Sequence, residues 1–425
     1  MSDLRRLDEI VQKVNDKITF KKDLSKPYVG LEHIGTRSSY LSGFSEANTS
    51  ISTNAVFSAG DVLFGKLRPN LRKCVVAPFD GYCSTDILVL RANSDVCNRF
   101  VGRVFQTEKV GSAAEMTAIG TKMPRTSWTH LKEVEVYYPD RHSQEVIANI
   151  LDTLDTTIRQ TEAIIAKLQQ VKQGLLHDLL TRGIDANGQL RPPVEQAPHL
   201  YKESPLGWIP MEWEVGPLSY CVASLDAGVS VNAEDRPHGS SEIGVLKTSA
   251  ISNGVFYPEQ NKTVISREIG LVREPVRADS ILVSRMNTPL LVGESCYVDV
   301  DSPSLFLPDR IWQLKIRDSS VVQTKWLSYI FRTSRYRAYV EIHATGTSGS
   351  MKNLPKSRLL GMPVAFPKFR EQLQTSNRMT AIDQRINAER ANLRKLINEK
   401  SALMDDLLTG RVRVTSLLAQ VDASS

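Results

Sequence analysis

The chain lacks the features that mark secreted, disulfide-bonded and membrane proteins. Its five cysteines are odd in number and show no Cys-x-x-Cys spacing, so we expect neither a disulfide framework nor a structural zinc site, and a reducing cytoplasm fits. No apolar run approaches ~18 residues, the length that a membrane-spanning helix needs. The opening stretch, MSDLRRLDEIVQKVNDK, carries charges without the apolar core of a signal peptide. We therefore expect a cytoplasmic protein with no membrane partner.

Motifs of enzymes that act on nucleic acids or nucleotides are missing too. The chain contains no Glu-x-Lys, which a common class of metal-dependent nucleases needs, and no Asn/Asp-Pro-Pro-aromatic element of an amino-methyltransferase. The stretch GDVLFGKL from Gly60 to Leu67 resembles a phosphate-binding loop, but leucine stands where that motif has Ser or Thr. The seven histidines show no metal-ligand spacing. We therefore expect no catalytic residue, no metal site and no cofactor in this chain.

What the chain has instead is an internal repeat. From Ile147, mostly apolar positions recur at alternating steps of four and three residues as far as Leu179, and the pattern returns 228 positions later. Such a seam is typical of a long helix that pairs with another helix. The two stretches end in LLTRGI and LLTGRV, whose glycines can end a helix. The predicted helix-pairing residues are Leu151, Leu154, Ile158, Ile165, Leu168, Leu175, Leu179, Met379, Ile382, Ile386, Leu393, Leu396, Leu403 and Leu407.

The repeat extends upstream into two globular regions. VEVYYP and GMPVAFP precede the two helices, and SAGDVLFGKLRPN resembles VRADSILVSRMNTP further upstream. Short β-branched runs separated by Gly, Pro, Asn and Asp predict mainly β structure with some helix. A stretch rich in Pro, Gly and polar residues between the halves predicts a linker. The predicted order is a globular domain at 1–143, a helix at 144–182, a linker at 183–205, a second globular domain at 206–371, a helix at 372–410 and a tail at 411–425.

Basic and amide side chains gather at matching places in the two globular halves. The stretch GKLRPNLRK follows a strand-like run in the first half, and a glycine-containing turn follows later in each half. Arg, Lys, Asn, Ser and Thr are the residue types that reach base edges and phosphates of DNA. Any one of them is equally well explained as a solvated surface charge, but their recurrence in both halves favours binding for the set. The predicted DNA-binding residues are Lys66, Arg68, Asn70, Arg72, Lys73, Thr121, Lys122, Arg125, Lys247, Arg285, Asn287, Ser348, Lys352 and Asn353.

The long helices themselves are not basic, because acidic residues outnumber basic ones between Gln144 and Leu180. They are therefore interpreted as elements for pairing and docking and not for DNA contact. A helix of about 35 residues spans about 50 Å at ~1.5 Å per residue, which is longer than local packing requires.

The order of globular region, long helix, linker, globular region and long helix resembles the specificity subunit of type I restriction–modification enzymes. The resemblance covers essentially the whole chain. It rests on GLLHDLLTRGID at the end of the first helix, SPLGWIPMEWEV at the opening of the second half, and LMDDLLTGRVRV at the end of the second helix. Members of that family usually carry a tryptophan-containing opener before the first half as well, which this chain lacks.

The resemblance implies an α+β fold. Two mixed, mainly β target recognition domains would be separated by two long helices paired as an antiparallel coiled coil, with an internal pseudo-twofold repeat. Each domain would read one half of a bipartite, asymmetric site in double-stranded DNA, and the helices would set the unread gap. Because the halves differ outside the anchor points of the repeat, we expect two different half-sites and no palindrome.

The resemblance also implies partners, in a prokaryotic cytoplasm. Two methyltransferase (modification) subunits would dock on the chain and supply S-adenosylmethionine and the base-flipping chemistry. A restriction and translocation subunit that uses ATP and Mg is a further possible partner, and without it the same chain would serve a modification-only complex. A coiled-coil scaffold that reads no DNA stays open as another role. An enzyme acting alone is disfavoured by the missing motifs.

Overall fold

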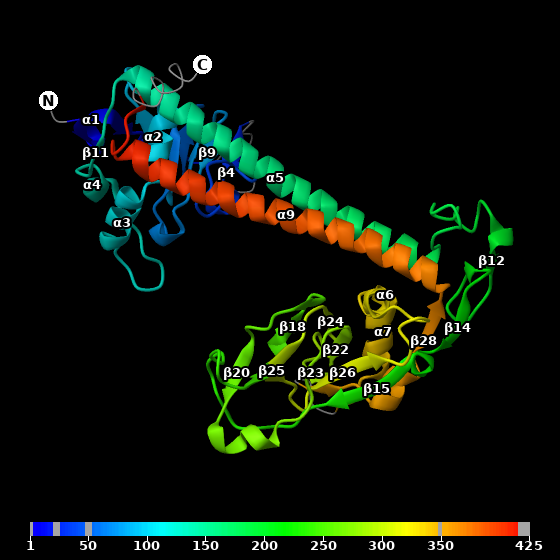
Figure 1. Cartoon of the computed structure of the whole chain (residues 1–425). Helices are drawn as coiled ribbons and strands as arrows, with labels where there is room; N and C mark the ends of the chain where they lie inside the picture. The colour runs from blue at the N-terminus through cyan, green and yellow to red at the C-terminus, as the bar shows by residue number, and fades with distance from the viewer. Residues whose placement is uncertain (1–2, 20–25, 47–52, 347–350, 415–425) are drawn as a thin grey trace, which may run out of the picture. The chain divides into compact units, whose positions relative to one another are not determined.

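The computed structural model describes residues 3–19, 26–46, 53–346 and 351–414 (Figure 1). The chain forms two compact units that combine helices and sheets. Unit 1 comprises the residues up to Ile165 together with those from Ala388 onward, and unit 2 comprises the residues from Ala166 to Asn387.

Unit 1 contains two sheets that share a core. The first is antiparallel with the order β2-β10-β7-β8, and the second has the order β3-β6-β9-β4-β5 with one parallel pair, β4·β9. Val62 and Phe64 of β7 join the core beneath the helices, whereas Leu63 joins the core between the sheets. Both faces of this strand are buried, which explains its continuous apolar run. The strands are β2 (Val11–Lys13), β3 (Lys17–Thr19), β4 (Pro27–Val29), β5 (Ser45–Glu46), β6 (Thr53–Phe57), β7 (Val62–Gly65), β8 (Cys74–Val76), β9 (Gly81–Cys83) and β10 (Ile87–Ala92).

Unit 2 is built in the same way. Its sheets have the orders β15-β26-β22-β24 and β16-β20-β17-β25-β21, and the parallel pair is β17·β25. Ile281 and Val283 of β22 face the core that holds the helices, whereas Leu282 faces the core between the sheets. The strands are β15 (Val222–Ala227), β16 (Ala233–Glu234), β17 (Gly244–Leu246), β20 (Asn261–Val264), β21 (Pro275–Val276), β22 (Ser280–Ser284), β24 (Ser295–Val298), β25 (Ser302–Phe306) and β26 (Ile311–Ile316).

The two units arrange their strands alike, with one difference at the edges. β2, β10, β7 and β8 take the places of β15, β26, β22 and β24. In the second sheets, β6-β9-β4-β5 matches β21-β25-β17-β20 in order and in strand direction. The edge strand differs, because β3 lies beside β6 in unit 1 whereas β16 lies beside β20 in unit 2.

Short helices and strand pairs complete each unit. Phe100 and Val101 of α2 pack on the core beneath the first sheet of unit 1, and Trp326 and Leu327 of α6 pack on that of unit 2. The short helices are α1 (Leu7–Ile10), α2 (Asn98–Val104), α3 (Glu108–Met116), α4 (Trp128–Leu131), α6 (Thr324–Ile330), α7 (Ser334–His343) and α8 (Lys356–Leu360). The strand pairs are β1 (Leu4–Arg6) with β11 (Glu135–Tyr137), β12 (Tyr201–Lys202) with β13 (Ile209–Pro210), β14 (Glu214–Pro217) with β28 (Pro363–Phe366), β18 (Ile251–Ser252) with β19 (Val255–Phe256), and β23 (Met286–Asn287) with β27 (Lys352–Asn353).

Two long helices, α5 (Arg141–Thr181) and α9 (Phe369–Leu408), begin with the same anchor. Gln144 is fully buried, accepts the backbone N–H of Cys97 at 2.9 Å, and donates to the carbonyl of Pro139 at 2.9 Å. Gln372, 228 positions later, accepts the backbone N–H of Gln323 and donates to the carbonyl of Pro367, also at 2.9 Å. In each unit a glutamine therefore ties the first turn of a long helix to the start of a short one, α2 or α6.

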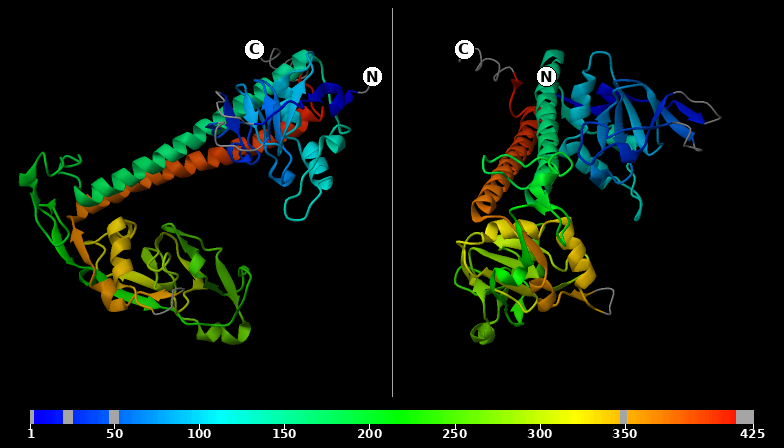
Figure 2. Two further views of the ribbon diagram at one scale, coloured as in Figure 1. Left: turned by 180° about the vertical axis from the view of Figure 1, so that it is seen from behind. Right: turned by 90° about the vertical axis from the view of Figure 1, so that its right-hand side faces the viewer.

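Within each unit the corresponding parts of α5 and α9 lie side by side (Figures 1 and 2). In unit 1 the Lys400 ammonium lies 2.5 Å from the Asp155 carboxylate, and in unit 2 Lys172 pairs with Asp383. From Asp155 to Lys172 the first helix advances by 17 residues, and from Lys400 to Asp383 the second retreats by 17. The two pairs therefore mark one antiparallel register, and each pair is the repeat equivalent of the other.

The fourteen residues predicted to pair the helices are all buried or half-buried. In unit 1 Leu407 and Leu403 share a core with Ile147 and Leu151. In unit 2 Leu179 packs with Met379, and Leu175 and Ile382 lie against the same cluster. These contacts agree with pairing between the helices, but the pairing role of each of the fourteen residues stays a prediction.

The segment that follows α5, for which the sequence predicts a linker, is folded against unit 2. The Glu371 carboxylate at the start of α9 accepts the backbone N–H of Ile184 at 2.7 Å, the Arg191 guanidinium at 2.6 Å and the Trp213 indole N–H at 3.2 Å. Gly183 has φ +67°, and a Cβ at that position would lie 2.1 Å from Glu371 Oε1. The segment after α5 is thus packed and hydrogen-bonded to the start of α9, and it is not a flexible linker.

Asp155 joins three parts of unit 1. It accepts hydrogen bonds from Arg103 of α2 and from the Ser39 hydroxyl, in addition to its pair with Lys400 of α9. Burial alone would raise the pKa of Asp155, but Arg103, Lys400 and Ser39 together lower it. Arg103 is itself buried and also pairs with Asp152, so removal of the Asp155 carboxylate would break one of its two ion pairs in a buried site.

We predict that Asp155→Asn lowers the free energy of unfolding at pH 7 by about 3 kcal/mol, because it removes the counter-ion of Lys400 and one of the two counter-ions of Arg103. A carboxylate with a depressed pKa contributes stability that is present above its unfolded value and is lost as the pH falls through its folded value. The wild type should therefore lose more stability than Asp155→Asn when the pH falls below about 4. Denaturant titrations between pH 7 and pH 2 measure both effects.

The matched control is Glu162→Gln, a change at an exposed carboxylate on the same helix. It should leave the unfolding midpoint within experimental error of the wild type. Equal midpoints for Asp155→Asn and Glu162→Gln at pH 7 would contradict the role assigned to Asp155.

Candidate nucleic-acid interface

In unit 1, backbone hydrogen bonds bring two of the predicted DNA-binding segments together at the end of β7. Lys66, the residue after β7, donates its N–H to the carbonyl of Asp86 at 2.9 Å and accepts the N–H of Thr126 at 3.0 Å. Arg68 donates its N–H to the carbonyl of Pro124 at 2.8 Å. The GKLRPN stretch and the turn that contains Thr121, Lys122 and Arg125 therefore form one surface.

The side chains of this surface are mostly free to reach a ligand. Arg68, Asn70, Thr121 and Lys122 are exposed. Arg125 is exposed as well, but its guanidinium makes two hydrogen bonds with the Asp86 carboxylate, at 2.9 and 3.1 Å. The Arg125 hydrogen bond holds the pKa of Asp86 below its usual range, so the pair stays ionised. Arg125 is thus positioned before any ligand arrives.

Arg72 and Lys73 are directed into the protein. Arg72 is buried and pairs with Glu108, at 2.5 and 2.6 Å, and with Glu115 at 3.0 Å. The Lys73 ammonium donates to the carbonyl of Leu31 at 2.6 Å. A DNA contact by Arg72 would leave both glutamates unpaired, so we correct this prediction and remove Arg72 and Lys73 from the proposed interface.

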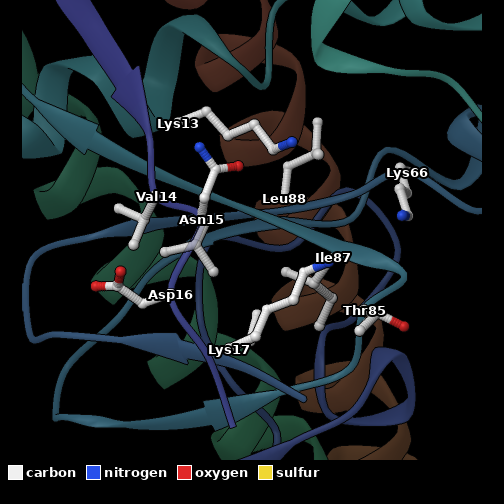
Figure 3. Close-up of a pocket in the computed structure, with 11 residues that line it drawn as sticks. Lys13, Val14, Asn15, Asp16, Lys17, Lys66, Thr85, Ile87 and Leu88 are labelled. Carbon is white, nitrogen blue, oxygen red and sulfur yellow. The ribbon is translucent and has the colours of Figure 1, made fainter. Parts of the chain in front are cut away.

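A pocket of about 110 Å³ next to Lys66 brings two further residues to this surface that are not among the predicted DNA-binding residues (Figure 3). Lys13 and Lys17 line it together with Lys66, Asn15 and Asp16. Burial lowers the pKa of Lys66, with smaller contributions from Lys13, Arg125 and Lys17 that oppose the attraction of Asp86. Three lysines around one pocket favour an anion such as a DNA phosphate. Lys13 and Lys17 lie four residues apart near the start of the chain, and only the pairing of β2 with β10 and of β3 with β6 brings them to Lys66.

Unit 2 holds the same backbone arrangement with different side chains. Arg285 follows β22, donates its N–H to the carbonyl of Arg310 at 3.0 Å and accepts the N–H of Leu354 at 2.8 Å. Its guanidinium lies 5.8 Å from the ring centroid of Trp312, over the indole. The pairing of β23 with β27 then places Asn287 beside Lys352 and Met286 beside Asn353.

The remaining predicted residues of unit 2 are placed differently. The Lys352 ammonium donates to the carbonyl of Gly346 at 2.9 Å, and the Asn287 amide donates to the Ser284 hydroxyl at 3.3 Å. Lys247 pairs with Asp235 at 2.8 Å in the second sheet, and no described contact joins it to Arg285. Ser348 lies outside the described residues.

Two further properties bear on the class of protein. Within the described residues, no group of three or more His, Cys, Asp or Glu side chains is placed to hold a metal ion. None of the helices in the described parts of the chain combines the length and apolar character that a bilayer span requires.

Comparison with known proteins finds relatives in sequence and in fold. Residues 2–170 match the family described as type I restriction modification DNA specificity domain. The type I restriction enzyme MjaVIII specificity subunit of Methanocaldococcus jannaschii is 23% identical over 301 residues, which cover 70% of this chain and 67% of that protein. The putative MjaX specificity subunit of the same organism is 22% identical, over 97% of this chain and 94% of that protein.

A crystal structure of a type I restriction–modification S subunit from M. genitalium has a similar fold. The two structures superpose with a TM-score of 0.59 at 13% sequence identity, and the match covers 95% of each chain. A second similar structure, whose title concerns complex assembly and conformational transition of the type I R-M system, superposes with a TM-score of 0.54 at 16% sequence identity and covers 96% of this chain. The chain is therefore a relative of the specificity subunits of type I restriction–modification enzymes, and its match to the family model lies in residues 2–170.

Proposed function

We propose that each unit is a target recognition domain that reads one half of a bipartite, asymmetric DNA site. The observation that carries this proposal is the repeated loop pair. In both units a cation follows the matched strand, Lys66 after β7 and Arg285 after β22, and its carbonyl accepts the N–H of a second loop. Both loop pairs carry the residue types that reach phosphates and base edges.

The side chains at matched positions differ, which favours two different half-sites. Lys66 donates its backbone N–H to Asp86, whereas Arg285 donates to Arg310. Within the second loop, an isolated β-bridge joins Ile119 to Arg125 in unit 1 and Thr345 to Asn353 in unit 2. Arginine matches the two acceptors of guanine, and asparagine matches the donor and acceptor of adenine. The surface of unit 1 therefore offers the Arg125–Asp86 pair, whereas the surface of unit 2 offers Arg285, Arg310 and the amide of Asn353.

We also propose that α5 and α9 form an antiparallel coiled coil in an internal pseudo-twofold repeat, and that this coil sets the unread gap. The matched ion pairs of Asp155 and Lys172 support one continuous register. The predicted seam residues are all buried or half-buried, which supports pairing along both helices. With 40 residues, α9 is about 60 Å long at ~1.5 Å per residue, which matches at most about 18 base pairs at ~3.4 Å each.

The exposed faces of the helices are the proposed docking sites for two methyltransferase subunits. Ile164, Val171, Leu373 and Ile397 are large apolar residues that stay exposed on α5 and α9. Exposed apolar side chains on a long helix favour a protein partner. Those partners would supply S-adenosylmethionine and, with a restriction subunit, ATP and Mg, in the cytoplasm. A complex without the restriction subunit would use this chain unchanged.

A scaffold that does not read DNA is the second candidate. It would require that the chain, once assembled with its methyltransferase, binds all duplexes equally. The matched cationic loops disfavour it, because a scaffold has no use for Lys66 and Arg285 at equivalent places.

We predict that exchange of residues 214–366 for those of a related specificity subunit changes one half of the methylated site and leaves the other half and the gap unchanged. The ends of this segment are neighbours, because Glu214 pairs with Phe366 across β14 and β28. Methylome sequencing of cells with the wild-type and exchanged chains measures the result. A change in both half-sites would contradict one domain per half-site.

We predict that Lys122→Ala weakens binding of the methyltransferase complex to all duplexes and reduces the slope of log affinity against log salt by about 1, because one phosphate contact is lost. Unfolding should be unaffected, since Lys122 is exposed. Arg72→Ala is the matched contrast and should lower the free energy of unfolding by roughly 2 kcal/mol without changing the salt slope. Fluorescence anisotropy at several salt concentrations and denaturant titration separate the two.

We predict that insertion of one heptad after Ala166 and one after Asn387 lengthens the unread gap by about 3 base pairs, because seven residues add about 10.5 Å to the coil. Both insertions are needed to preserve the register that the two Lys–Asp pairs mark. Insertion after Ala166 alone is the control, and it should lower stability. An unchanged gap in a stable double insertion would exclude the coil as the ruler.

A further inference from the structure

Three large apolar side chains project from the end of α3 and from the loop after it, which carries Thr121 and Lys122. The exposed fraction is 87% for Met116, 75% for Ile119 and 50% for Met123. Scattered exposed apolar residues are common, but three within eight positions form a patch.

The loop that bears these side chains is held in place. Ile119 and Arg125 exchange two backbone hydrogen bonds at 3.0 Å, and Leu67 forms a bridge to Arg125. Gly120 has φ +114°, which allows the tight turn between them. The Arg125–Asp86 pair anchors the base of the loop. The apolar tip is therefore presented on an ordered support.

Unit 2 repeats the feature around its equivalent loop. Ile342, near the end of α7, has an exposed fraction of 78%, just as Met116 ends α3. Met351 is also exposed, lies 228 positions after Met123 and directly precedes Lys352. Leu290 has an exposed fraction of 83%, and the Arg337 guanidinium donates to its carbonyl at 3.3 Å. Both units thus expose methionine, isoleucine or leucine beside the cationic loops.

A ligand that covers this surface must offer apolar groups to the apolar tip and negative charges to the cations around it. Arg68, Lys122 and Arg125 lie around the apolar tip of unit 1. Interfaces between proteins are depleted in lysine, whereas the phosphates of a duplex need cations around any apolar contact with bases. DNA-binding proteins insert methionine, leucine and isoleucine side chains between base steps, which unstacks and bends the duplex.

We propose that Met116, Ile119 and Met123 in unit 1, and Leu290, Ile342 and Met351 in unit 2, form apolar wedges that press against bases of each half-site and unstack one step. The surrounding cations hold the phosphates on either side. The proposal rests on the reading role proposed above and assigns each unit a means of sensing how easily its half-site deforms.

The test uses the assembled methyltransferase complex and duplexes that carry 2-aminopurine at successive positions of the methylated site, since the fluorescence of this base rises when it is unstacked. With the wild type we expect a rise at one or two adjacent positions in each half-site other than the methylated base, which the methyltransferase itself would flip out of the stack. Ile119→Ser combined with Met123→Ser should abolish the rise in the half-site of unit 1 and weaken binding about tenfold. The rise in the other half-site should remain.

Two control variants make the result specific. Ile119→Leu combined with Met123→Leu keeps the apolar tip and should retain the fluorescence rise. Val300→Ser changes a residue of unit 2 that is exposed to a similar degree but lies in the turn between β24 and β25, and it should leave both half-sites unchanged.

Three results would contradict the proposed wedge role of these side chains. The first is a wild-type complex that binds its site without any rise in fluorescence. The second is a Ser double variant that keeps the rise. The third is a Ser double variant that no longer assembles with the methyltransferase, which would make the patch a protein interface. A wild-type complex that binds no duplex selectively would instead defeat the proposed reading function, so the two failures are distinguishable.

Discussion

The fold depends on two lysines that lie within an otherwise largely apolar seam. Lys172 and Lys400 occupy seam positions, and each is neutralised by an aspartate on the other helix. A slip by one heptad would place Lys172 opposite Arg390 and Lys400 opposite Glu162, whereas a slip in the other direction would place Lys172 opposite Ser376 and Lys400 opposite Ala148. Both lysines find an aspartate only in the observed register. Polar residues in a helix seam cost stability and exclude alternative registers, and this chain uses the same device twice.

The repeat preserves backbone arrangements and lets side chains diverge. In unit 1, Arg103 ties α2 to Asp155 of the long helix. The residue 228 positions later is Phe331, so the equivalent aspartate, Asp383, has no arginine at that place. Unit 2 has instead a cavity of about 500 Å³ lined by Asp383, Tyr329 and Arg332 among others. Apart from one edge strand, strand order is common to the two units, as are the glutamine anchors, whereas the side chains of the cationic loops and the contacts between short and long helices differ.

Much of this organisation could be predicted from the sequence because it is periodic or local. The seam from Leu151 to Leu407 follows from steps of four and three, and the cationic positions Lys66 and Arg285 follow from alignment of the repeat. The helices begin three residues before the predicted 144 and 372. In the first case Asp140 accepts the N–H of Ser143 at 3.0 Å and so opens the helix earlier.

What could not be predicted depends on contacts distant in sequence. Arg72 stands among exposed basic residues, and only the packing of α3 brings Glu108 and Glu115 to it. Lys13 and Lys17 reach Lys66 through strand pairing that no local pattern encodes. The sequence likewise does not show that the edge strands are β3 in one unit and β16 in the other, because the position of a strand in a sheet depends on pairing with distant strands.

The joint around Glu371 has a mechanical consequence. One carboxylate holds the turn after α5, the Arg191 guanidinium and the Trp213 indole, all at the first turn of α9. Four hydrogen bonds on two oxygen atoms leave little freedom for rotation about this point. A torque applied to this segment of unit 2 would therefore pass directly into the first turn of α9. The connection is thus mechanically stiff, and it couples the orientation of the segment after α5 to that of the second long helix within unit 2.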